Sequence, residues 1–374
     1  MTSLKLSDLC NIRYGKDHKE LAGGPYPVYG SGGIMRYVEK SISQGPSVLI
    51  PRKGTLGNLF YTDGPFWTVD TLFWTEIDDR QIIPKYLYYL LKTEDLAGLN
   101  IGTAVPSLST DVLNEIQLSI PEMETQKKTI ALLDSIESKI NINNQINDYL
   151  EELGGILVGK YLDACKVVCS LSDVLDLGNG FAFKSDTYVT DGRYKVLTIK
   201  NVQDGSVDCS SSNRVDALPT KMKDYCKLKT GDVVLSLTGN VGRVGIVAEP
   251  DCLLNQRVAV LLPSDNRYLA ALYFIFRQKS FQNKMIGIAK GTAQANLSPV
   301  ETLRLSIPYE ESQFGKLTTT LRPVFDAILA NKIESLKLIE FRGALLPKLM
   351  SGEIDVSRVE PPMQLGSNQF DGRL

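Results

Sequence analysis

Short runs of β-branched and aromatic residues, separated by Gly, Pro and Asp, predict β-strands in two parts of the chain. These runs cover 46–50, 59–62 and 71–77 in the first part, and 232–237, 244–250 and 257–263 in the second. In each part a stretch with apolar residues on one helical face follows the strands, at 84–95 and at 267–285. The two parts therefore share one order of elements, with strands first and a helix afterwards.

A short polar phrase is written twice, as GTAVPSLS at 102–109 and as GTAQANLS at 291–298. Other landmarks recur in the same order, among them LSDL at 6–9 with LSDV at 171–174 and the Ile-Pro pairs that end at Pro121 and Pro308. The offset between the copies drifts because residues are inserted, mostly between Val196 and Gly231. A constant frame with a variable interior suits one scaffold that presents two different binding surfaces.

Each copy of the phrase predicts a tight turn and then a short capped helix. Ser298 begins a capping box, with Pro299 at the first helical position and Glu301 three residues after the serine. Ser109 and Asp111 supply a reduced version of this cap in the first copy. The short helix leads into a strand that ends in Ile-Pro.

A long amphipathic segment follows each Ile-Pro pair, and acidic residues close to the proline suit a helix N-terminus. Apolar residues and asparagines recur at three-four spacing, at Leu133, Ile136, Ile140, Asn143, Asn147 and Leu150 and again at Leu321, Val324, Ile328, Asn331, Leu338 and Leu345. This pattern predicts a coiled-coil seam in which asparagine fixes the register at a cost in stability. Roughly forty residues per helix correspond to a rod of about 60 Å. We expect helix ends or kinks at Gly154-Gly155, Pro347 and Gly352.

The chain is predicted to have five segments. They are a globular domain at 1–121, a helix at 122–164, a second domain at 165–308, a second helix at 309–352 and a mobile polar tail at 353–374. The simplest way for one chain to pair two such helices is antiparallel, which relates the two domains by a pseudo-twofold axis. The predicted fold class is α+β, with two α/β domains in pseudo-twofold arrangement joined by two long antiparallel coiled-coil helices.

Composition narrows the classes of function without selecting one. The net charge of −2 means that any nucleic-acid contact must come from local basic patches. No apolar run is long enough to span a bilayer and the first residues lack a signal-peptide pattern, so a cytoplasmic protein without membrane contact is expected. Six scattered cysteines and a single histidine, His18, argue against a metal site and for reduced, buried thiols.

Several further motifs surround the two long helices. They are YGSGG at 29–33, IKNVQDGSV at 199–207, GTAxxxLS in both copies, SIPxxExQ ending at Gln126 and Gln313, and LLPKLMSGEIDV at 345–356. Each motif is weak by itself, but their order and duplication are specific. Together they resemble the specificity subunit of type I DNA restriction-modification systems over nearly the whole chain.

The resemblance implies that each globular domain is a target-recognition domain for one half of a bipartite double-stranded DNA site. The paired helices would set the gap between the halves. It also implies partners, which are DNA adenine methyltransferase (modification) subunits docked largely through the helices and restriction subunits that translocate and cleave DNA. Those partners would hold S-adenosylmethionine, ATP and Mg²⁺, and this chain would bind no cofactor.

The chain itself is expected to be non-catalytic. It contains no Walker-type GxxxxGK[ST] sequence, no Asn/Asp-Pro-Pro-aromatic methylase motif and no convincing carboxylate cluster of a nuclease. A histidine-based triad would have to use His18, which sits in a lysine-rich stretch without an obvious partner.

Candidate DNA contacts follow from chemistry, since phosphates attract Lys, Arg and backbone amides while base edges attract Arg, Lys, Asn and Gln. Loops that precede or link the predicted strands offer Lys16, Lys19, Arg52, Lys53 and Thr55 in the first copy, and Lys184, Lys200, Asn201, Thr238, Asn240, Arg243, Gln256, Arg257 and Lys290 in the second. Thr103, Thr292 and Gln294 in the repeated phrase are further candidates, although helix capping explains much of that phrase. The alternative for these loops is a set of hairpin turns with solvated charges.

A second class of function remains open at the level of sequence. The acidic pI of about 5.7 also suits a bridging scaffold whose two modules bind proteins or glycans instead of DNA. DNA affinity that falls steeply with salt would argue against the scaffold, because neutralising phosphates releases counterions.

Overall fold

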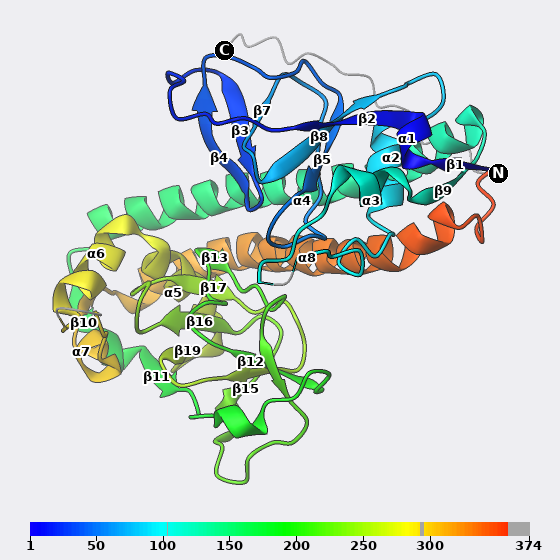
Figure 1. Ribbon diagram of the computed structural model, residues 1–374. Coiled ribbons are helices and arrows are strands. Elements are labelled where there is room, and N and C mark those ends of the chain that lie inside the picture. Colours follow the sequence, from blue (N-terminus) through cyan, green and yellow to red (C-terminus); the bar gives the residue numbers. More distant parts are fainter. Residues whose placement is uncertain (103, 292–294, 358–374) are drawn as a thin grey trace. The chain divides into compact units, whose positions relative to one another are not determined.

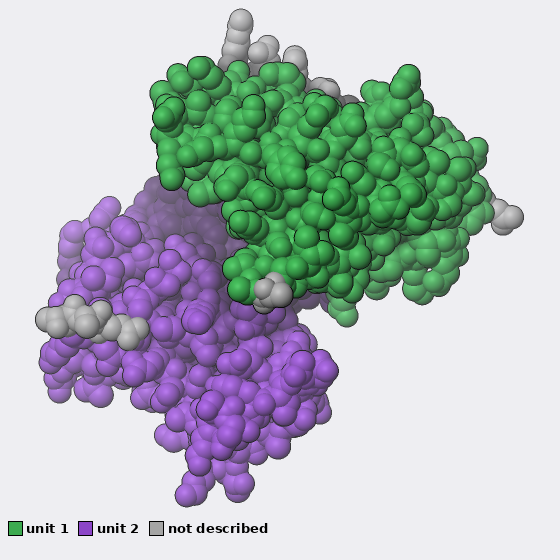
Figure 2. Space-filling view, viewed as in Figure 1, with its two compact units in different colours: residues 1–138, 339–374 green, residues 139–338 purple. Residues whose placement is uncertain are grey.

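A computed structural model describes residues 1–102, 104–291 and 295–357, and the chain divides into two units (Figure 1). Unit 1 comprises residues 1–138 and 339–374, of which residues after 357 lie outside the described part, and unit 2 comprises residues 139–338 (Figure 2). This division differs from the five segments of the sequence, because each unit is completed by part of both long helices.

Unit 1 contains three small sheets. The two-stranded sheet pairs β1 (Thr2–Lys5) with β9 (Gln117–Ile120). The four-stranded sheet has the order β2 (Cys10–Tyr14), β8 (Leu72–Ile77), β5 (Ser47–Pro51), β6 (Phe60–Thr62). The three-stranded sheet has the order β4 (Gly33–Val38), β3 (Tyr26–Gly30), β7 (Trp67–Thr68). Its short helices are α1 (Leu6–Leu9), α2 (Pro84–Leu91) and α3 (Thr110–Asn114).

Unit 2 contains the same kinds of sheet with additions. The two-stranded sheet pairs β10 (Val168–Ser170) with β20 (Ser306–Pro308). The five-stranded sheet has the order β11 (Leu175–Asn179), β19 (Val258–Pro263), β16 (Val233–Ser236), β17 (Val244–Ile246), β13 (Gly205–Ser206). The four-stranded sheet has the order β14 (Asn213–Val215), β12 (Tyr194–Leu197), β18 (Cys252–Leu254), β15 (Lys227–Leu228). Its helices are α5 (Leu269–Arg277), α6 (Lys279–Ile288) and α7 (Pro299–Leu303), with 3₁₀ turns η1 (Leu171–Asp173), η2 (Ser185–Thr187), η3 (Asp224–Cys226) and η4 (Asn266–Tyr268).

The two units repeat one topology, which confirms the internal duplication. The order β2, β8, β5, β6 in unit 1 corresponds to β11, β19, β16, β17 in unit 2, with antiparallel pairs throughout. The parallel pair of β3 and β7 likewise corresponds to β12 and β18. The strands that unit 2 adds, β13 and β15, both lie between Val196 and Gly231, where the sequence indicates the insertion.

The predicted strands and short helices are largely confirmed, with one correction. The stretch 267–285, expected to be one helix, forms η4, α5 and α6, because Gln278 between α5 and α6 has an extended backbone with ψ of 129°. This break packs the Phe281 ring against Phe276, with the ring centroids 4.9 Å apart. The serine caps are confirmed, since the Ser109 hydroxyl accepts from Val112 N–H and the Ser298 hydroxyl accepts from Glu301 N–H. The Glu301 carboxylate, expected to complete a capping box, instead accepts from Arg304 Nη1 at 3.0 Å.

Two long helices, α4 (Met123–Ala164) and α8 (Glu311–Met350), are unbroken over 42 and 40 residues (Figure 1). In unit 1, Arg342 of α8 donates to the Glu137 carboxylate of α4. In unit 2, Asn143 Nδ2 lies 2.8 Å from Glu334 Oε2, and Asn331 Nδ2 lies 2.9 Å from Asn147 Oδ1. Within unit 2, partner numbers on α8 fall as those on α4 rise, so the helices pair antiparallel there, as predicted.

The predicted seam between these helices contains buried polar amides. Asn143 and Asn147 are 0% and 6% exposed, and Leu133, Ile136, Ile140, Leu321, Ile328 and Leu345 of the seam are also buried. An apolar seam can slide by a helical turn at little cost, whereas a slide would leave these amides without partners. The asparagines therefore fix the register. Among the described residues, neither these helices nor any other is apolar over a length that could cross a membrane.

The glycines expected to end or kink the first helix do neither. A Cβ atom at Gly154 would lie 2.2 Å from the Phe274 ring, and the carbonyl of Gly155 accepts from Gln278 Nε2 at 2.9 Å. Gly154 instead lets the Phe274 ring of α5 approach the last third of α4. Pro347 also lies inside α8, and only Gly352, with φ of +75°, marks a helix end as predicted.

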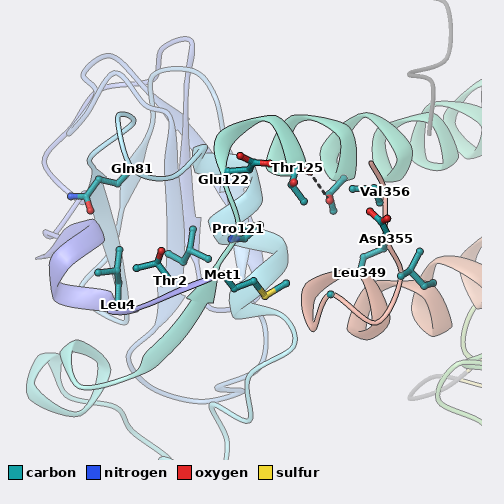
Figure 3. A pocket seen from close by; sticks show the side chains of 14 residues that line it. Met1, Thr2, Leu4, Gln81, Pro121, Glu122, Thr125, Leu349, Asp355 and Val356 are labelled. Atoms are coloured by element: carbon teal, nitrogen blue, oxygen red, sulfur yellow. Dashed lines mark hydrogen bonds between the residues drawn. The ribbon is translucent and has the colours of Figure 1, made fainter. Parts of the chain in front are cut away.

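The described start of the predicted mobile tail is packed against unit 1. Val356 is 2% exposed, and Lys128 Nζ donates to the Ser357 carbonyl at 2.6 Å. Figure 3 shows Val356 and Leu349 beside a cavity of about 610 Å³, which Met1, Leu4 and Thr125 also line. The polar residues of SGEIDV predict an exposed segment, but its valine is buried.

Substitution of Gly154 by Ala should destabilise unit 2 by about 1–3 kcal/mol, because the added methyl group must displace the Phe274 ring. Gly159 on the same helix has open space at its Cβ position, so Gly159→Ala should stabilise by about 0.5–1 kcal/mol through helix propensity. Urea unfolding of both variants measures the two effects. Equal stabilisation by the two substitutions would contradict the close packing at Gly154.

Candidate nucleic-acid interface

A glycine-containing loop follows the same strand in each unit, and the repeated GTA phrase holds it in place. The Arg52 carbonyl after β5 accepts from Leu108 N–H at 2.9 Å, and the Leu237 carbonyl after β16 accepts from Leu297 N–H at 2.7 Å. Leu108 and Leu297 occupy the same place in the two copies of the phrase. The phrase therefore recurs because each copy supplies the backbone partner of one loop.

Each loop turns on a glycine in the left-handed region, with φ of +94° at Gly54 and +74° at Gly239. A side chain at such a position strains the backbone, so glycine is required for the geometry. The residues beside the two glycines differ in chemistry, being Lys53 and Thr55 in unit 1 and Thr238 and Asn240 in unit 2. The same frame thus presents different groups in the two units.

In unit 1, the turn between β7 and β8 gathers several predicted contacts. Lys16 N–H donates to the Thr68 carbonyl at 2.9 Å, Arg52 Nη1 to the Asp70 carbonyl at 3.3 Å, and Lys53 N–H to the Thr71 carbonyl at 3.3 Å. Beside this turn lies a cavity of about 680 Å³ that is lined by residues including Asp17, His18, Lys19, Ser31, Asp70 and Thr71. Lys16, Lys19, Arg52 and Lys53 therefore surround one surface of unit 1, and Thr55 follows on the exposed loop.

The charge state of these side chains suits an anionic ligand. Lys16, Lys19 and Lys53 are exposed, and in the described part of the chain Lys16 and Lys53 form no ion pair. Lys19 lies near Asp17, whose pKa is lowered first by the backbone N–H of Lys19 and also by its charge. Arg13 and Arg80 in the same unit are instead neutralised by Glu76 and Asp78. Unpaired cations can approach phosphates without first breaking an ion pair.

In unit 2, three loops meet around the equivalent glycine. Leu237 N–H donates to the Arg257 carbonyl at 2.9 Å, and Lys290 and Asn296 exchange backbone hydrogen bonds of 3.0 and 2.8 Å. Arg257 has φ of +70°, which is uncommon for a residue with a side chain and is often found at functional sites. Asn240, Arg257 and Lys290 are exposed at this surface, and the two cations lack ion-pair partners among the described residues.

The remaining candidates of unit 2 lie in different settings. Arg243 is half-buried and donates from Nη1 to Gln203 Oε1 at 3.3 Å, a contact that sequence reasoning missed. Lys200 precedes Gln203 in the same turn and is exposed. Gln256 is exposed next to Arg257, whereas no described contact joins the exposed Lys184 to this group.

Two predicted contacts are contradicted by burial. Asn201 is 2% exposed, and its amide donates to the Asp208 carbonyl at 2.9 Å and accepts from Thr198 N–H at 2.8 Å. Thr238 is 1% exposed and its hydroxyl donates to Asn296 Oδ1 at 2.9 Å. Both side chains complete turns, as short polar side chains commonly do, and are not available to DNA.

Some candidates fall outside the described residues, namely Thr103, Thr292 and Gln294 of the repeated phrase. Among the described residues, no group of three or more His, Cys, Asp or Glu side chains could hold a metal ion. All six cysteines are free thiols, five of them buried, and burial raises the pKa of Cys10 to about 12.

Comparison with known proteins identifies relatives over nearly the whole chain. Residues 1–152 and 166–338 match the family described as type I restriction modification DNA specificity domain. The type I restriction enzyme MjaIX specificity subunit of Methanocaldococcus jannaschii is 25% identical over 91% of this chain and 86% of that protein. The HindI specificity subunit of Haemophilus influenzae is 22% identical, over 84% and 88% of the two chains.

A solved structure supports the fold. The crystal structure of a type I restriction-modification S subunit from M. genitalium is similar to this chain with a TM-score of 0.55 at 18% sequence identity. The match covers 93% of this chain and 95% of that chain. At this level of identity the similarity concerns the fold and not the residues that contact a ligand.

Substitution of Asn201 by Ala should cost about 2–4 kcal/mol of stability, since buried partners lose their hydrogen bonds. The neighbouring exposed Lys200→Ala should stay within about 0.5 kcal/mol of the parent protein. Thermal or urea unfolding measures the stability of both variants against that of the parent protein. An Asn201→Ala protein of unchanged stability but altered ligand selectivity would instead show that Asn201 contacts the ligand.

Proposed function

The chain belongs to the type I restriction modification DNA specificity family, and we propose that it reads a bipartite double-stranded DNA site, with one half-site for each unit. The observation that carries this proposal is the duplicated glycine loop, held by the same backbone hydrogen bonds at Arg52 and Leu237 but flanked by different side chains. Two equivalent frames with different chemistry suit a site whose halves differ in sequence.

The distribution of charge supports DNA as the ligand in spite of the acidic composition. The net charge is −2, yet Lys16 and Lys53 in unit 1 and Arg257 and Lys290 in unit 2 are exposed on the loop surfaces without ion-pair partners among the described residues. Local unpaired cations are sufficient for phosphate contacts. Asn240 and Gln256 add the amide groups that pair with base edges.

The helices support the proposal that partner subunits dock on them. Five apolar side chains of α4 recur at three-four spacing on its solvent side and are 41–73% exposed, namely Ile142, Ile146, Tyr149, Leu153 and Ile156. A contiguous exposed apolar stripe commonly marks a surface for another protein. We assign it to adenine methyltransferase subunits, which would carry S-adenosylmethionine, while restriction subunits would carry ATP and Mg²⁺ and this chain would remain non-catalytic.

Mixing the full chain with its adenine methyltransferase subunit and unmethylated genomic DNA should yield methylated adenines within a gapped, two-part consensus. Sequencing of modified adenines measures the outcome. Methylation without such a consensus would contradict the proposal.

The slope of log DNA affinity against log salt concentration should become shallower by about one for Lys53→Ala, because one phosphate contact is lost. Substitution of the exposed Lys40 by Ala, outside the loop surface, should leave this slope unchanged.

Lengthening both helices should widen the gap and keep both half-sites. Seven residues added to α4 between Ile140 and Leu150, with seven added to α8 between Ile328 and Leu338, lengthen the pair by about 10 Å, or roughly three base pairs. Both insertions are needed because Asn147 pairs with Asn331 across these segments. The same methylation assay measures the gap. Changed half-sites at a constant gap would contradict the proposal that the length of the helices sets the gap.

A further inference from the structure

The turn at residues 200–206 of unit 2, which contains the sequence KNVQDGS, is closed by the side chain of Gln203. Gln203 Nε2 donates to the Lys200 carbonyl at 2.9 Å, and Gln203 N–H donates to the Ser206 carbonyl at 2.9 Å. The remaining amide oxygen accepts from Arg243 Nη1 at 3.3 Å. One side chain therefore closes the turn and holds a candidate DNA contact.

The register of two strands brings this turn to Arg243. Strand β13 pairs parallel with β17, so that Gly205 lies opposite Gly245, two residues after Arg243. A Cβ atom at Gly245 would lie 2.3 Å from the Ser206 carbonyl oxygen, which shows how closely the two backbones approach. Gln203 reaches the guanidinium because of this close pairing.

A second arginine anchors the other side of the same turn. Arg277, the last residue of α5, donates from Nη1 to Asp204 Oδ1 at 2.5 Å and from Nε to Glu151 Oε2 of α4 at 3.3 Å. The side chains of Arg277 and Glu151 are only 19% and 16% exposed. Gly205 has φ of +87°, and a Cβ atom there would lie 3.2 Å from the Arg277 guanidinium, so this group also packs on the turn.

The two arginines differ in what neutralises them. Arg277 sits between two carboxylates, so its charge is balanced inside unit 2. Among the described residues, the Arg243 guanidinium donates to the neutral amide of Gln203 and forms no ion pair with a carboxylate. Gln203 thus orients Arg243 while leaving its positive charge and its remaining N–H donors for a ligand.

We infer that Gln203 and Arg277 are positioning residues for Arg243, which contacts DNA in the half-site that unit 2 reads. Arg277 fixes the turn against α4 through Glu151 and Asp204, and Gln203 transmits that position to the guanidinium. The inference rests on the proposed function, since it takes DNA as the ligand of Arg243. It assigns a task to the 199–207 motif, which capping and strand formation do not explain.

The described part of unit 1 has no strand equivalent to β13, which carries this turn. Its four-stranded sheet ends at β6, whereas the equivalent sheet of unit 2 continues from β17 to β13. Loss of the positioning contacts must therefore affect one half-site and spare the other. A general loss of folding or assembly would instead affect both halves together, which separates a positioning role from a merely structural one.

The test compares Gln203→Ala, Asp204→Asn and Arg243→Ala with the parent chain, each in complex with the adenine methyltransferase subunit, on unmethylated genomic DNA. Arg243→Ala should lose about tenfold in selectivity at one or more positions of one half-site. Gln203→Ala and Asp204→Asn should lose about threefold to fivefold at the same positions, because they remove orientation and leave the contact itself. Asp204 is 61% exposed, so its isosteric replacement does not threaten the fold.

A double variant and a control sharpen the comparison. Gln203→Ala combined with Arg243→Ala should be no worse than Arg243→Ala alone, because the amide acts only through the guanidinium. Asp326→Asn removes another exposed carboxylate of unit 2, which pairs with Arg322 along α8 at 2.8 Å. This control should leave both half-sites unchanged.

The results distinguish a failure of the proposed function from a failure of the positioning role of Gln203 and Arg277. A parent complex that gives no gapped consensus contradicts the proposed function itself. A gapped consensus that Arg243→Ala leaves intact overturns the inference, as does a change caused by Arg243→Ala alone without the two positioning variants. Equal effects of Gln203→Ala on both half-sites would also overturn it.

Discussion

The hydrogen bond between Asn147 of α4 and Asn331 of α8 is the contact on which the arrangement of unit 2 depends. An apolar seam alone would allow the helices to slide by one turn, because leucine and isoleucine pack almost equally well at neighbouring positions. With the amides paired, Glu151 and Gly154 have fixed positions along α4, where they contact Arg277 and Phe274 of α5. The loop surface of unit 2 inherits its position from this register.

Unit 1 attaches its sheets to the helices by a different device. Gln126 in the second turn of α4 is fully buried, accepts from Ile83 N–H before α2 at 2.8 Å, and donates to the Pro121 carbonyl at 3.0 Å. The matching Gln313 of α8 is exposed, and the adjacent Phe314 is buried in its place. The glutamine that ends the repeated motif is therefore buried and bonded to neighbouring backbone in only one of its copies.

Features with local causes could be predicted from the sequence. The strands, the caps at Ser109 and Ser298 and the existence of both long helices depend on residues a few positions apart. The roles of Gly154 and Asn201 could not be predicted from nearby residues, because they depend on the Phe274 ring and on a turn closed at Asp208. The candidate lysines could be found from their loops, but only the fold separates unpaired cations from those neutralised by a carboxylate.

The way in which the loops are held explains how one frame can present two different sets of side chains. Backbone groups tie each loop to its GTA phrase, from Leu108 to Arg52 in unit 1 and from Leu297 to Leu237 in unit 2. A backbone hydrogen bond does not depend on the side chain of either residue, so an arginine and a leucine serve equally as acceptors. The side chains beside the glycine can therefore be exchanged without a change in the scaffold, and under the proposed function this would change the bases that each unit reads.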